Sequence, residues 1–96
     1  MITSKDLVLV RTLSAGVHVG ELVSKDGPEV TLANAHRIWR WRGANTLNEL
    51  ALRGASMDAF TRISESVTEI ILIEAIEIIA ISDAAVKNLT TPRWLP

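Results

Sequence analysis

Four segments of the first forty residues have patterns that predict β-strands: residues 6–13, 17–24, 29–33 and 36–41. Residues 6–13 alternate only weakly and are rich in Leu and Val, as expected of a strand buried on both faces. Residues 17–24 alternate apolar with polar positions, except at Glu21 and Leu22. Ser14-Ala15-Gly16 provides a small-residue turn after the first segment, and Lys25-Asp26-Gly27-Pro28 provides a glycine turn after the second. We therefore expect antiparallel hairpins in the first part of the chain.

Two short helices are indicated by residues that begin and end helices. Thr46 and Glu49 have the spacing of a capping box, and Gly54 can end the helix that they begin. Ser82 can cap a second helix over residues 83–89. Both helices are therefore expected to be short.

Residues 64–81 allow two interpretations. Four glutamates, at positions 65, 69, 74 and 77, are spaced so that they can trace one face of a helix. Seven of the twelve residues from 70 to 81 are isoleucine, however, and β-branched side chains crowd a helix and favour a strand. We therefore expect a strand over this segment, with a bend near Glu74-Ala75.

Such a strand has apolar side chains on both of its faces. With Ile70 and Leu72 directed to the core, Ile71 and Ile73 point to the opposite side, where Glu69 also lies. Two short helices are few elements to cover that second side. We therefore expect a homo-oligomer, a dimer or a larger ring, built partly on residues 70–81 with acidic residues at its rim.

Together these elements predict a single domain over residues 1–96 with an α+β fold: a small, mainly antiparallel β-sheet or partly open barrel with two short helices. Hydrophobic residues make up 48% of the chain and charged residues 22%, which indicates a globular rather than a disordered protein. The absence of cysteine excludes a disulfide scaffold and a thiolate zinc site. A net charge of −1 provides no basic field to hold duplex nucleic acid.

No apolar stretch is long enough for a signal peptide, or for a membrane span of roughly 20 residues. The most apolar segment, residues 70–81, contains two glutamates. We therefore expect a cytoplasmic protein with no membrane partner.

Recognisable catalytic motifs are absent from the chain. His18 and His36 stand outside any such motif, and there is no P-loop, dinucleotide fingerprint or HExxH sequence. Glu74 and Glu77 would point to opposite faces of a strand, which separates the two carboxylates. We therefore expect a protein that is not an enzyme and has no cofactor or metal; in the rival enzyme hypothesis, Glu74, Glu77 and His18 are the candidate acid–base groups.

The densest group of chemically distinctive side chains lies in residues 36–42, which hold three of the seven arginines and two of the three tryptophans. Strand alternation places Arg37, Trp39 and Trp41 on one face, and His36, Ile38, Arg40 and Arg42 on the other. Indoles stack on nucleobases and guanidinium groups bind phosphates in a bidentate manner, so this mixture suits a nucleotide. It equally suits a protein interface, or tryptophans in the core with solvated arginines outside.

Other residues can extend such a site. Arg11 is the first candidate, and Arg53, Arg62 and the pair Arg93-Trp94 are further ones. Backbone N–H groups of the Ser14-Ala15-Gly16 turn can hold an anion, with His18 beside them as a hydrogen-bond donor. The alternative is an ordinary bend between strands, with His18 as a half-buried structural side chain.

Two motifs resemble those of a family of small, mostly uncharacterised phage and prophage proteins. They are the run from Val10 to Gly20 (VRTLSAGVHVG) and the run from Asn34 to Trp41 (NAHRIWRW) with Gly43-Ala44 after it. The later Glu74–Ile79 run is similar to an acidic, isoleucine-rich strand of that family. The resemblance extends from about Leu7 to Leu89.

More distantly, the pattern resembles the Thoeris anti-defence group of phage proteins, oligomeric sponges that sequester cyclic-nucleotide-type immune signals without cleaving them. This resemblance implies a non-catalytic protein of the host-cell cytoplasm that binds a small phosphate-bearing nucleotide. Its candidate ligand-binding residues are Arg37, Trp39, Arg40, Trp41, Arg42, His18 and Arg11. The alternative is a phage structural, assembly or protein-interaction component.

Overall fold

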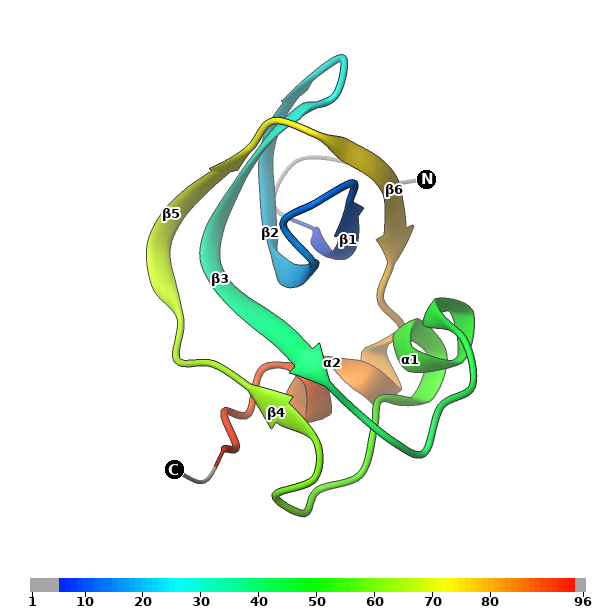
Figure 1. The fold of residues 1–96 in the computed structure, drawn as a ribbon. Helices are drawn as coiled ribbons and strands as arrows, with labels where there is room; N and C mark the ends of the chain where they lie inside the picture. Colours follow the sequence, from blue (N-terminus) through cyan, green and yellow to red (C-terminus); the bar gives the residue numbers. More distant parts are fainter. Residues whose placement is uncertain (1–5, 95–96) are drawn as a thin grey trace.

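The computed structural model of the protein describes residues 6–94; residues 1–5, on which the expectation about a signal peptide partly rests, lie outside the described part. The elements in chain order are β1 (Leu7–Thr12), β2 (Val17–Asp26), β3 (Glu29–Arg40), α1 (Leu47–Arg53), β4 (Arg62–Ile63), β5 (Val67–Leu72), β6 (Ala75–Ala80) and α2 (Asp83–Leu89) (Figure 1). The six strands form one antiparallel sheet that is not closed into a barrel. The predicted α+β fold, mostly β with two short helices, is confirmed.

The strands are ordered β4-β3-β2-β1-β6, and β5 pairs with β3 beside β4. The consecutive strands β5 and β6 therefore lie at opposite margins of the sheet, and their connection arches over its end (Figure 1). The arch is tied down by two backbone hydrogen bonds, from Ala75 N to Pro28 O at 3.0 Å and from Leu13 N to Glu74 O at 2.9 Å. The predicted strand over residues 64–81, with its bend at Glu74-Ala75, is thus confirmed as two strands.

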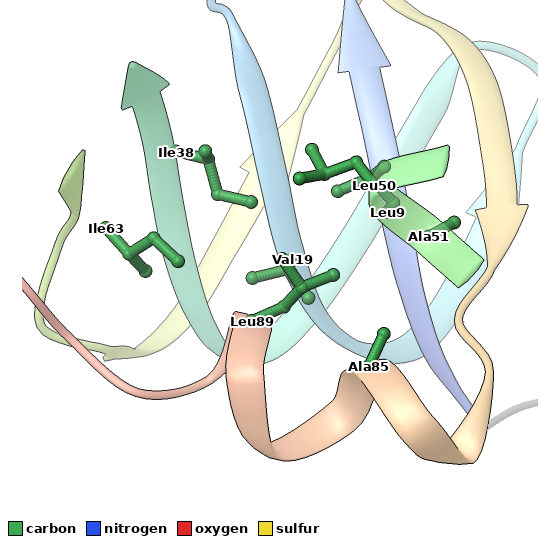
Figure 2. Packing of buried hydrophobic residues seen from close by; sticks show 8 residues of the cluster. All are labelled: Leu9, Val19, Ile38, Leu50, Ala51, Ile63, Ala85 and Leu89. Atoms are coloured by element: carbon green, nitrogen blue, oxygen red, sulfur yellow. The ribbon is translucent and has the colours of Figure 1, made fainter. Parts of the chain in front are cut away.

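One face of the sheet is covered by the two helices. Leu9, Val19, Ile38 and Ile63 on the strands pack against Leu50 and Ala51 of α1 and against Ala85 and Leu89 of α2 (Figure 2). The opposite, concave face holds a second cluster, formed by Val8, Val10, Leu22, Val30, Leu32, Ala35 and Leu72. Neighbouring residues of β1 belong to different clusters because strand side chains alternate between faces.

The middle of β3 departs from the expected pattern. Instead of two segments separated at residues 34–35, one strand continues through Asn34, which adopts a left-handed φ of 49°. Gly20 lies opposite on β2, where an added Cβ would stand 3.1 Å from the carbonyl oxygen of Ala33. The bulged backbone and the missing side chain let the two strands pair closely here.

The ends of the elements correct some expectations and confirm others. β3 ends at Arg40, so Trp41 is not part of the strand, and the two-residue strand β4 was not predicted. Thr46 caps α1 as expected, accepting a hydrogen bond from Glu49 N at 3.3 Å. Ser82 occupies the N-cap position of α2 as expected, but its hydroxyl donates to Leu52 O and makes no capping hydrogen bond to the helix. Within residues 6–94, neither helix has the length and apolar character that a membrane crossing requires.

Candidate functional site

The contact between His18 and Arg37 joins two residues that the sequence analysis placed in separate groups. They are direct cross-strand partners on β2 and β3. Arg37 Nε donates to His18 Nε2 at 3.2 Å, and the backbone of Arg37 is held by Ser64, whose Oγ accepts from Arg37 N at 2.8 Å. The guanidinium is therefore aimed at the imidazole, while its Nη groups have no partner among the described residues.

His18 is a buried, neutral histidine. Its side chain is 1% exposed, and burial together with the charge of Arg37 lowers its pKa from 6.5 to about 4. Because Nε2 accepts from Arg37, the neutral ring carries its proton on Nδ1. Nδ1 is buried with no partner within residues 6–94, which leaves one unused hydrogen-bond donor at this point of the concave face.

A hollow of about 290 Å³ opens beside this pair. It is lined by His18, Arg37, Ser64, Val67 and Ile70. Three of these residues come from β5 and the connection before it; the sequence analysis placed Ile70 in the core and named neither Ser64 nor Val67 as a site residue. Of these three, only Ser64 has a polar side chain, and its hydroxyl is hydrogen-bonded to Arg37 N and Glu65 O.

The two tryptophans of residues 36–42 lie in different environments. Trp39, two residues along β3 from Arg37, is 49% exposed. Trp41 is partly buried against the helix-side cluster. The predicted common face of Arg37, Trp39 and Trp41 is therefore wrong for Trp41, because the strand ends before it.

Arg40 and Arg42 meet at Phe60 instead of at the hollow. Their guanidinium carbons lie 4.4 and 5.0 Å from the centre of the Phe60 ring. Arg40 Nε donates to Phe60 O at 2.9 Å, and Arg42 forms an ion pair with Asp58. This exposed cluster of two arginines on one aromatic ring is built by the loop before β4, which the sequence analysis left without structure.

Arg11 lies apart from both groups. On β1 it faces Glu77 of the neighbouring β6, with 3.6 Å between Nη1 and Oε1. Both side chains are about half exposed, so the pair is a surface salt bridge. Arg11 therefore does not join His18 and Arg37 at the hollow.

Arg93 is saturated by its own chain. Its guanidinium donates to the carbonyl oxygens of Ser56, Asn88 and Thr91 at 2.7–2.8 Å, and to Asn88 Oδ1 at 2.9 Å. Burial lowers the pKa of Arg93. Its backbone also bonds Ile63 in both directions. Arg93 thus fixes the last described residues to the fold, and its guanidinium donors are engaged by the chain itself and are not available to bind a ligand.

The candidate acid–base residues are also separated. Glu74 bonds the hydroxyl of Ser14, Glu77 faces Arg11, and His18 lies on the concave face. In the described part of the chain, no three His, Asp or Glu side chains come close enough to hold a metal ion.

Comparisons with known proteins identify a family. No curated protein and no solved structure gives a match. The family model that matches describes a domain of unknown function, DUF6948, and it covers residues 5–89. Since this match includes β1 to α2, and with them both sides of the hollow, the chain belongs to the DUF6948 family.

Proposed function

We propose that the protein binds a small phosphate-bearing ligand of nucleotide type at the hollow beside His18 and Arg37, and holds it without chemical change. The observation that carries the proposal is a guanidinium with free Nη groups, held beside the hollow by its hydrogen bond to a buried imidazole. Guanidinium groups bind phosphate oxygens through two parallel hydrogen bonds.

The size of the hollow limits what it can enclose. Its volume of about 290 Å³ lies at the lower end of small-molecule sites, which run from roughly 300 to 1,000 Å³. A phosphate with its sugar fits that range better than a complete cyclic dinucleotide. The exposed indole of Trp39 offers a stacking surface for a base that extends out of the hollow.

Binding without turnover is supported by the chemistry of the lining. The five lining residues include no carboxylate. The hydroxyl of Ser64 donates to Glu65 O, so its proton is already engaged, and a histidine with a pKa of about 4 is a weak base. A protein of this kind sequesters a nucleotide-derived signal in the cytoplasm of a phage-infected cell, the role implied by the anti-defence resemblance.

The experiment is calorimetric titration against cyclic di- and trinucleotides, cyclic ADP-ribose forms and mononucleotides. We expect one ligand class to bind and to be recovered intact after the protein is denatured. Arg37→Gln should weaken binding at least tenfold, whereas the matched control Arg53→Gln, on the exposed side of α1, should leave it unchanged. No binding at about 100 µM ligand, a weak affinity for capture, overturns the proposal.

A second candidate function, a structural or protein-interaction component, is favoured by the exposed cluster of Arg40, Arg42 and Phe60. Arginine and aromatic residues are concentrated at the centres of protein interfaces. Mass spectrometry of purified virions distinguishes the two functions. A structural component appears there in stoichiometric amount, while a sequestering protein is found only in the lysate of infected cells.

A further inference from the structure

The last described residues of the chain lie beside β4 at the end of the sheet. Ile63 of β4 and Arg93 exchange two backbone hydrogen bonds, with N···O distances of 2.9 and 3.0 Å. β4 therefore lies between the end of β3 and the segment around Arg93 (Figure 1). Since neighbouring residues of an antiparallel pair are also opposite each other, Arg62 is opposite Trp94.

On its other side, Arg62 is opposite Arg40 of β3. The register of β3 and β4 shifts between Ile38 and Arg40, so Trp39 is the extra residue of a bulge at this point. Four side chains thus come from adjacent positions of three segments that are distant in sequence. They are Trp39, Arg40, Arg62 and Trp94, and together they form the tryptophan–arginine strip.

The side chains of Arg62 and Trp94 point to the face of the sheet that the helices leave open. Ile63 packs in the helix-side cluster, and the guanidinium of Arg93 donates to Asn88 of α2, so both of these side chains point to the helices. Side chains of successive strand residues alternate between the two faces. Arg62 and Trp94, the neighbours of Ile63 and Arg93, therefore point to the opposite face.

The two arginines of the strip have no acidic partner. The ion pairs within residues 6–94 use other arginines, and none includes Arg40 or Arg62. The Nε of Arg62 is buried and has no hydrogen-bond partner in this part of the chain, while Arg40 uses only its Nε, which donates to Phe60 O at 2.9 Å. Like charges on directly opposite strand residues repel each other, and an anion bound between them converts this repulsion into attraction.

We propose that the tryptophan–arginine strip binds single-stranded nucleic acid, with bases stacked on the two indoles and a phosphate held between the two guanidinium groups. Trp39 and Trp94 are 49% and 44% exposed, and exposed aromatic rings of this kind stack on the unpaired bases of a single strand. Guanidinium groups bind phosphate oxygens through charge-assisted hydrogen bonds. A duplex keeps its bases stacked on one another, and an acidic peptide brings no base to the indoles.

This inference does not rest on the proposed function. The hollow beside His18 and Arg37 is lined by five residues, and none of them belongs to the strip. Arg62→Gln should therefore weaken the binding of an oligonucleotide and leave the binding of a mononucleotide at the hollow unchanged. Loss of both in this variant would overturn the strip as a separate site.

The first test is fluorescence anisotropy of a labelled oligothymidylate of about eight nucleotides, inside the roughly 4–16 nucleotides that a small β-barrel domain covers. At about 50 mM salt we expect a dissociation constant below about 100 µM for this single strand. A duplex of the same length and a polyglutamate peptide should bind at least tenfold more weakly. No binding of the single strand, or equal binding of either competitor, overturns the proposal.

Substitutions test whether the oligonucleotide lies on the strip. Trp94→Ala should weaken binding about fivefold or more, as for one lost base stack, whereas Trp94→Phe keeps a ring and should lose less. Arg62→Gln should lower the slope of log affinity against log salt by about 0.7, the contribution of one phosphate contact to a single strand.

The matched control is Lys87→Gln, which removes the same charge from an exposed position of α2 and should change neither the affinity nor the salt slope. Circular dichroism melts verify that each variant folds. Equal effects of Arg62→Gln and Lys87→Gln would mean that the oligonucleotide responds only to the total charge, and would overturn the proposal.

Discussion

Arg93 and Arg37 show what an arginine does when its own chain satisfies it and when it does not. The guanidinium of Arg93 donates four hydrogen bonds to backbone and amide oxygens, and so holds the end of the chain against α2 and the loop after α1. The guanidinium of Arg37 makes one side-chain hydrogen bond, to the nitrogen of a neutral imidazole. The first arrangement stabilises the fold, and the second leaves donors available beside a hollow.

The largest expected effect on the free energy of unfolding is that of replacing Arg93, and it tests the structural role that this comparison gives to Arg93. Arg93→Ala leaves its acceptor oxygens without a partner, and we expect the free energy of unfolding to fall by about 4 kcal/mol, as for several lost charge-assisted hydrogen bonds. Chemical denaturation measures this loss. Arg93→Lys, which keeps the charge but cannot reach every acceptor, should lie between wild type and alanine. A loss below about 1 kcal/mol would contradict the clamp.

The second effect is the pH dependence that comes from His18. Its pKa is 6.5 when unfolded and about 4 when folded, so the unfolded chain binds more protons between these values. Stability from this group is therefore complete above pH 6.5 and declines as the pH falls to 4. The expected decline is about 3 kcal/mol, from a pKa difference of 2.5 at 1.36 kcal/mol per unit.

Carboxylates also titrate as the pH falls and contribute to the measured dependence of stability on pH. The contribution of His18 is therefore obtained by comparing the wild type with a variant that lacks the imidazole. His18→Gln keeps a side-chain acceptor for Arg37 but cannot be protonated in this range. Unfolding curves from pH 7.5 to 4 should be steeper for the wild type than for this variant. Parallel curves would show that the imidazole is not buried as a neutral group.

The third effect concerns Arg37 itself. Arg37→Gln removes one partly buried hydrogen bond to His18 and should change the free energy of unfolding by no more than about 1 kcal/mol. The same substitution should raise the pKa of His18, because the repulsive charge is gone. NMR titration of the His18 ring checks the pKa. A stability loss as large as that of Arg93→Ala would make Arg37 a structural residue.

The smallest effect is at Arg11, an arginine of a third kind. Its pair with Glu77 is about half exposed and 3.6 Å long, so Arg11→Ala should cost at most about 0.5 kcal/mol. Denaturation at low and high salt checks this value. A larger cost would mean that surface pairs stabilise this sheet more than their exposure suggests.

Local patterns determined the secondary structure well. The strand–turn–strand order of the first part, the Thr46 cap and the isoleucine-rich strand with its bend follow from side-chain branching, turn residues and alternation, which act between neighbours in sequence. The break that was expected in the middle of β3 is absent because contacts between strands, and not the local sequence, decide the backbone path there. Asn34 was expected in a break, but the glycine on the opposite strand lets the backbone bulge and continue.

The sequence by itself determined that this protein is a small, mostly β domain with clustered arginines and tryptophans and no recognisable catalytic motif. Only the tertiary structure decided which of those side chains meet. All seven arginines have the same chemistry, and their roles differ because their neighbours come from distant parts of the chain. Arg37 faces His18 across a strand pair, Arg93 reaches Ser56 from the end of the chain, and Arg40 and Arg42 meet at Phe60. Contacts over such separations depend on strand register and loop path, which no short stretch of sequence encodes.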